Sequence, residues 1–164
     1  MGLHRFVRPA LPAVLLVVLS ACGGSEAAGR PVEATAREYA FRGLPDTLEA
    51  GETTFSIDNR GSEVHEIHVF RLDDDVNTVS ELLGKSQDEA QDRMTSVEMA
   101  SANPGDKASF DADLPAGRYA AVCLIPVGTF PDEGLSGHDM EDMVFDPNAD
   151  THMRRGMFAE FTVG

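Results

Sequence analysis

Apolar and polar residues alternate along several short stretches of this chain, with turn-forming glycines between them. Neighbouring side chains of a strand point to opposite faces, so this alternation predicts strands with one buried face. Short strands separated by turns at regular spacing are typical of β-sandwiches and β-barrels. The predicted strands cover residues 32–41, with a short continuation at 47–48, and residues 53–59, 64–72, 107–114, 117–125 and 158–163, and we expect about seven or eight strands in all.

Between residues 73 and 96 the period of the apolar residues changes from that of a strand to that of a helix. Asp75 or Asn77 can cap a first helix at its N-terminus. Ser86 and Glu89 have the spacing of a capping box, which predicts a second short helix. We expect a small helical insertion at about residues 73–96, packed on one end of the strand domain. Its apolar positions are Val76, Val79, Leu82 and Leu83.

The first 21 residues have the parts of a secretory signal peptide: a basic segment, an apolar run and small residues. The apolar run is too short for a comfortable transmembrane helix. Residues 19–22, Leu-Ser-Ala-Cys, resemble the lipobox of bacterial lipoproteins, in which the cysteine is acylated. We therefore expect a lipid on Cys22 that anchors the protein in the cell envelope, on the outer face of the cytoplasmic membrane. Ordinary cleavage that leaves Cys22 free is the alternative. Residues 22–31 are predicted to be a flexible tether, and residues 32–164 a single domain.

The chain is strongly acidic, with 28 acidic and 13 basic residues and a formal net charge of −15. Such a surface repels phosphate groups, which argues against nucleic acid and against adhesion to anionic lipid. We expect an exported, monomeric domain whose partners are other exported redox proteins.

The number of cysteines limits the roles that Cys123 can have. The chain has two cysteines, so an acylated Cys22 leaves Cys123 as the only thiol, with no internal disulfide available to it. A lone exported cysteine is structural filler, an intermolecular link or a functional thiolate. The residue types near the predicted strand ends favour the last of these.

Four residues at strand ends have side chains that bind copper. His65 follows a turn that begins at Asn59, Cys123 ends the segment AGRYAAVC, and His152 and Met157 precede the closing segment FAEFTV. In this order the segments resemble the cupredoxin family, of the plastocyanin and azurin type. The resemblance implies a Greek-key β-sandwich that holds one mononuclear type 1 copper ion. The implied ligands are His65, Cys123, His152 and an axial Met157, because a thiolate, two imidazoles and a weak thioether suit both copper redox states.

The long loop at about residues 126–151 departs from the cupredoxin pattern, in which the second histidine follows the cysteine closely. That loop contains a competing pair, His138 and Met143, with Met140 between them. We favour His152 and Met157 because they run directly into a phenylalanine-rich strand. The other pair is then either part of a surface loop or a second, weaker Cu(I) site.

Two further residues near His65 have predicted roles. Glu66 is a candidate for a hydrogen bond close to the site. His68 lies on the opposite face of the strand by alternation, so we expect a packing or surface histidine.

The sequence contains no glycine-rich phosphate loop, no Gly-x-Ser-x-Gly motif and no Cys-x-x-Cys pair. The implied copper ion has its coordination filled and offers no open position for a substrate, so we expect an electron carrier and not an enzyme. The alternative is a protein that captures or delivers copper outside the cytoplasm with the help of the His138–Met143 loop. Zinc bound by His65, Cys123 and His152 is a weaker alternative, because zinc has no need of the methionine.

Overall fold

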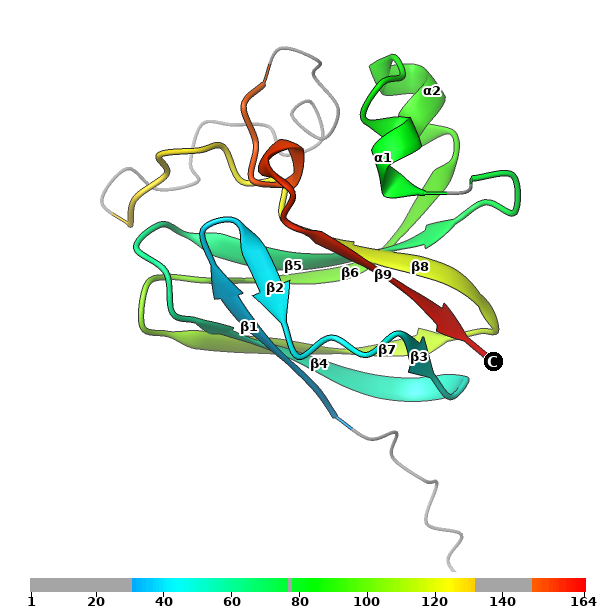
Figure 1. Ribbon diagram of the computed structural model, residues 1–164. Helices are drawn as coiled ribbons and strands as arrows, with labels where there is room; N and C mark the ends of the chain where they lie inside the picture. The colour runs from blue at the N-terminus through cyan, green and yellow to red at the C-terminus, as the bar shows by residue number, and fades with distance from the viewer. Residues whose placement is uncertain (1–30, 77, 132–148) are drawn as a thin grey trace, which may run out of the picture.

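The computed structural model describes residues 31–76, 78–131 and 149–164, and within them nine strands form two sheets that pack as a β-sandwich (Figure 1). The four-stranded sheet has the order β2 (Ala40–Arg42), β1 (Val32–Arg37), β4 (Gly51–Asn59), β7 (Lys107–Leu114). The five-stranded sheet has the order β3 (Thr47–Leu48), β9 (Phe158–Val163), β8 (Gly117–Val122), β5 (His65–Leu72), β6 (Met94–Ala102). Cys22, His138, Met140 and Met143 lie outside the described residues.

The chain crosses repeatedly between the sheets, for example from β4 to β5, from β6 to β7 and from β7 to β8. Neighbouring strands are antiparallel except for the pairs β1–β4 and β3–β9, which are parallel. This connectivity confirms the predicted Greek-key β-sandwich. Nine strands are described where about seven or eight are expected, because residues 32–41 form an antiparallel pair, β1 and β2, and because β6 was not predicted as a strand.

Strand β8 and the residues after it are buried on both faces, which explains why residues 119–125 are almost continuously apolar. One set of side chains, among them Tyr119, Ala121 and Cys123, packs in the core between the two sheets. The alternate set, Ala120, Val122 and Leu124, packs in a second core on the outer face of the five-stranded sheet.

Two short helices, α1 (Val79–Leu82) and α2 (Gln87–Gln91), cover that second core. The insertion therefore lies on the outer face of the five-stranded sheet (Figure 1), and the prediction that it packs on one end of the sandwich is wrong. The N-caps expected for α1, Asp75 or Asn77, are also wrong, because Thr78 is the N-cap and its side chain accepts from the N–H of Glu81.

The predicted capping box before α2 is confirmed: the Glu89 carboxylate accepts from the N–H of Ser86, and the Ser86 hydroxyl accepts from the N–H of Glu89. Residues from Met94 onwards belong to strand β6. The helical part of the insertion is thus shorter than predicted. Within the described residues, no helix has the length and apolar character needed to cross a membrane.

Candidate metal centre

His65 is the first residue of β5, and the loop before it is held in place by Asn59, the last residue of β4. The Asn59 side chain is buried; its amide donates to the carbonyl oxygens of Glu63 and Ala102, both at 2.8 Å. Its Oδ1 accepts from the N–H of Gly61, also at 2.8 Å. These three bonds fix the path of the chain into β5 and so the position of His65.

Cys123 follows β8 directly, at the point where this strand meets the segment that enters β9. The N–H of Cys123 donates to the carbonyl oxygen of Met157 at 3.1 Å. The N–H of Met153 donates to the carbonyl oxygen of Cys123 at 2.7 Å. Backbone pairing therefore carries Cys123 to the same place as the segment that contains His152.

His152 precedes a single 3₁₀ turn, η1 (Met153–Arg155), which ends at Gly156. Gly156 has φ of 103°, a left-handed conformation that favours glycine. The turn brings the N–H of Met157 to the carbonyl oxygen of His152 at 2.9 Å. The N–H of His152 donates to the carbonyl oxygen of Ile125 at 2.9 Å, which ties this turn to the end of the cysteine segment.

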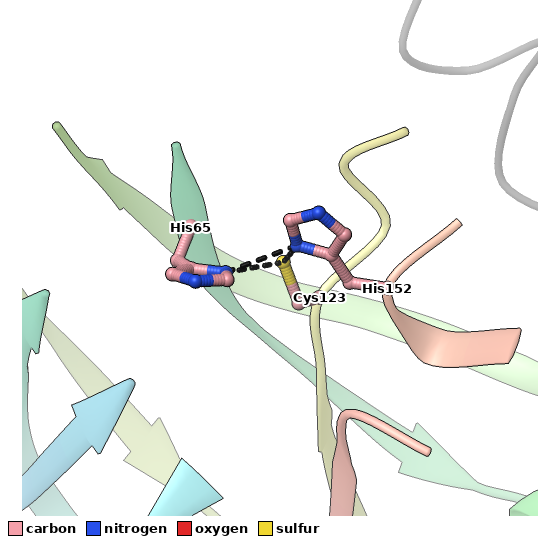
Figure 2. Close-up of side chains that lie close together, drawn as sticks. All are labelled: His65, Cys123 and His152. Atoms are coloured by element: carbon pink, nitrogen blue, oxygen red, sulfur yellow. Dashed lines mark hydrogen bonds between the residues drawn. The ribbon is translucent and has the colours of Figure 1, made fainter. Parts of the chain in front are cut away.

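Figure 2 shows the two imidazole rings pointing toward one another, with the cysteine sulfur beside them. The Nδ1 atoms of His65 and His152 are 3.0 Å apart. The sulfur of Cys123 lies 3.9 Å from Nδ1 of His65 and 3.3 Å from Nδ1 of His152. All three side chains are 0 % exposed. Three predicted ligands from three separate segments thus converge at one end of the sandwich.

The other ring nitrogen of each histidine faces a carboxylate. Nε2 of His65 lies 3.3 Å from Oε1 of Glu38, and Nε2 of His152 lies 3.0 Å from Oε2 of Glu63. A carboxylate accepts hydrogen bonds, so each Nε2 carries the proton and each Nδ1 is left with a lone pair. Two lone pairs 3.0 Å apart repel each other unless a cation lies between them.

Burial controls the ionisation of these groups. Burial raises the pKa of the Cys123 thiol well above its usual value, and the nearby Glu66 carboxyl adds to the effect. Burial also lowers the pKa of His65 and of His152. The histidines are therefore neutral at pH 7, as metal ligands must be. Cys123 becomes a thiolate only when a bound cation stabilises the charge.

Glu66 connects the two strands that carry His65 and Cys123. Its backbone N–H donates to the Cys123 sulfur at 3.4 Å, and its Oε1 accepts from the N–H of Leu124 at 2.9 Å. Burial raises the pKa of this carboxyl to about 7. Glu66 thus makes the hydrogen bond near the site that its position predicts.

Met157 and His68 complete the set of predicted residues. Met157 is 0 % exposed and packs in the core between the sheets. Its backbone is hydrogen-bonded to both Cys123 and His152. His68 lies away from the cluster, where its Nε2 contacts the hydroxyl of Ser96 at 2.7 Å. As predicted, His68 is a packing or surface histidine and lies outside the cluster. Glu38, Glu63 and Tyr39 were not identified from the sequence: Glu38 and Tyr39 fall within the predicted strand at 32–41 and Glu63 in a turn, and neither pattern indicates a contact with a distant histidine.

The donor set fits copper. Three donors arranged trigonally at about 2.0–2.3 Å from one ion are about 3–4 Å apart, which is the range seen between the two Nδ1 atoms and the sulfur. Two imidazoles and one thiolate in a trigonal arrangement are the donors of type 1 copper. The described part of the chain is a Greek-key β-sandwich with a His65–Cys123–His152 cluster whose donors can hold one copper ion.

No protein-family model and no curated protein matches the sequence. Among solved structures, a dithionite-reduced auracyanin from the photosynthetic bacterium Roseiflexus castenholzii aligns at 18 % identity and TM-score 0.49, over 82 % of this chain and 96 % of that one. Auracyanin B aligns at 20 % identity and TM-score 0.47, over 82 % and 88 % of the two chains. Auracyanin A, a "blue" copper protein from Chloroflexus aurantiacus, aligns at 15 % identity and TM-score 0.47, over 82 % and 98 %. At this similarity, the interpretation of the site rests on this chain's own side chains.

Proposed function

We propose that the protein holds one copper ion between His65, Cys123 and His152 and carries single electrons. The observation behind this proposal is the convergence of two histidine Nδ1 atoms and one cysteine sulfur, in side chains that are all fully buried. Copper supplies the one-electron couple between Cu(II) and Cu(I) when it is bound. If copper is bound, Met157 would supply a further, weak thioether ligand, since its backbone is hydrogen-bonded to both Cys123 and His152.

The protein contributes a rigid set of ligands. The backbone bonds of Cys123 and His152, and the Asn59 bonds before His65, fix each donor before the metal arrives. If copper is bound, donors held in this way would rearrange little when the ion gains or loses an electron. Little reorganisation on gain or loss of an electron favours fast electron transfer.

The burial of the cluster supports electron transfer over capture or delivery of copper. A delivery protein must pass its ion to a partner by ligand exchange, for which a ligand must be reachable. Here all three donors are 0 % exposed. For the same reason we propose that the protein is not an enzyme, since a substrate would need access to the metal.

We further propose that the protein is anchored by a lipid on Cys22 and exchanges electrons with exported redox proteins as a monomer. The lipobox-like residues 19–22 and the acidic composition support this proposal. Mass spectrometry of the mature N-terminus tests the lipid directly. An unmodified Cys22 in the native protein contradicts the anchor and leaves the copper site unaffected.

Visible absorption of the purified, Cu(II)-loaded protein tests the electron carrier. We expect an intense copper–thiolate band that disappears in Cys123→Ser and in His152→Ala. His68→Ala is the matched control, because His68 lies outside the cluster, and His138→Ala tests the competing loop histidine. A band that survives His152→Ala and is lost in His138→Ala would reassign the second imidazole. The absence of any copper–thiolate band in the unaltered protein would refute the proposed function.

A further inference from the structure

Two carboxylates from different loops contact the two histidines from outside the cluster. Glu38 lies between β1 and β2 and faces Nε2 of His65; Glu63 lies between β4 and β5 and faces Nε2 of His152. Each acid therefore contacts a histidine from a different segment of the chain. Glu63 lies two residues before His65 but contacts His152. A metal-binding imidazole whose outer N–H donates to a carboxylate is held in one tautomer and is a more basic ligand.

The Glu63 carboxylate is largely buried and is held beside His152 by several hydrogen bonds. Its side chain is 10 % exposed and accepts three hydrogen bonds, from Nε2 of His152 at 3.0 Å, from the hydroxyl of Tyr39 at 3.1 Å and from the N–H of Gly128. The Tyr39 ring also packs against His152, with the ring centroids 4.9 Å apart. Because every donor points at the carboxylate, these contacts hold Glu63 in its charged form.

Glu38 is more exposed, at 27 % of its side chain, and has its own set of donors. Its Oε1 accepts from the backbone N–H groups of Ser62 and Glu63, at 2.5 and 3.0 Å. The carboxylate can reach His65 only because residue 61 is glycine. A Cβ on Gly61 would lie 2.3 Å from Oε1 of Glu38 and 2.7 Å from Nε2 of His65.

We propose that Glu63 and Glu38 are positioning residues of the copper centre, which direct Nδ1 of each histidine at the metal and favour Cu(II) over Cu(I). This inference rests on the proposed function. A carboxylate bonded to a ligand imidazole places negative charge next to the metal, and the doubly charged ion gains more from it than the singly charged ion. Glu63 has the larger effect because it is less exposed and closer to its histidine than Glu38.

The test uses isosteric variants that remove charge and keep the acceptor. In Glu63→Gln the amide oxygen can still accept from His152 and Gly128, while the Tyr39 hydroxyl can turn to accept from the amide. The matched control is Glu52→Gln, which removes the same charge from an exposed position. Glu52 lies seven residues along β4 from Asn59, which is about 23 Å at the rise of a strand.

Redox titration of the copper-loaded protein provides the first measurement. We expect Glu63→Gln to shift the ratio of Cu(II) to Cu(I) affinity toward Cu(I) by about tenfold, equivalent to a rise of about 59 mV in reduction potential. We expect a smaller rise in reduction potential for Glu38→Gln. For Glu52→Gln we expect the ratio of Cu(II) to Cu(I) affinity to change less than twofold. The copper–thiolate band should remain in all three variants. If Glu63→Gln matches the Glu52→Gln control while the band is present, the inference is wrong and the proposed function stands.

Nitrogen-15 NMR of the metal-free protein provides a second measurement that does not depend on copper. We expect His152 to carry its proton on Nε2, and Glu63→Leu, which removes the acceptor, to produce a mixture of tautomers. Protonation of His152 on Nδ1 in the unaltered protein would overturn the inference. A chain that shows the expected tautomer but binds no copper would instead refute the proposed function and keep the positioning role of Glu63.

Discussion

Asn59→Ala is expected to destabilise the protein more than a typical buried polar-to-alanine change. The Asn59 side chain is 0 % exposed and makes three hydrogen bonds of 2.8 Å, to the backbone of Gly61, Glu63 and Ala102. Alanine leaves the two carbonyl oxygens buried without this partner. An unsatisfied buried group costs about 1–3 kcal/mol, so we expect a loss of about 2–4 kcal/mol in the free energy of unfolding.

Urea unfolding of the metal-free protein measures this loss. With a slope of about 1–3 kcal/mol per molar urea, the midpoint should fall by about 1 M or more. Asn103→Ala is the control, because Asn103 is exposed in a turn. Asn59→Asp is the sharper comparison: it keeps the acceptor for Gly61 but places a carboxylate oxygen against two carbonyls, so it should cost at least as much as alanine. A loss below about 1 kcal/mol for Asn59→Ala, or an aspartate variant as stable as the unaltered protein, would refute the reasoning.

Three further changes test other parts of the protein. Burial lowers the pKa of His68 to about 4, so the unfolded chain takes up a proton below about pH 6.5 while the folded protein does not; stability therefore falls as the pH falls from about 6.5 to 4. His68→Gln should lose about 1–2 kcal/mol less over this window in metal-free urea unfolding, after allowance for the partly exposed ring; an identical pH profile would contradict this. Met157→Leu keeps the packing but removes a donor that helps Cu(II), so the copper–thiolate band should remain and the reduction potential should rise; an unchanged potential would exclude an axial role. Gly61→Ala should displace the Glu38 carboxylate from His65 and so raise the potential as Glu38→Gln does, and a smaller rise than in Glu38→Gln would count against that contact.

The sequence determined most of the strands and which side of each faces the core, but it did not predict β6, whose first residues fall in the expected helical insertion. Alternation placed His65 and His68 on opposite faces of β5, and the structure shows one in the buried cluster and the other beside Ser96. It also predicted the sandwich, because strand periodicity is local: each side chain's direction follows from its neighbours. Another local signal, the spacing of Ser86 and Glu89, predicted the capping box.

Local patterns did not determine how the helical insertion packs. The apolar residues of α1 show that one side is buried, but not which surface covers it. The outer face of the five-stranded sheet became that surface because Ala120, Val122 and Leu124 are apolar as well. In the sequence, a strand apolar on both faces is compatible with several arrangements of neighbours.

Only the tertiary structure placed the carboxylates against the histidines. Glu38 is 27 positions from His65, and Glu63 is 89 positions from His152. Both acids lie in loops, where a side chain's direction follows no period, and both contacts depend on which strands meet at this end of the sandwich. Residue types and their order along the chain indicate a copper site. The contacts of the Glu38 and Glu63 carboxylates with the two histidines are instead determined by strand pairing between segments that are far apart in sequence.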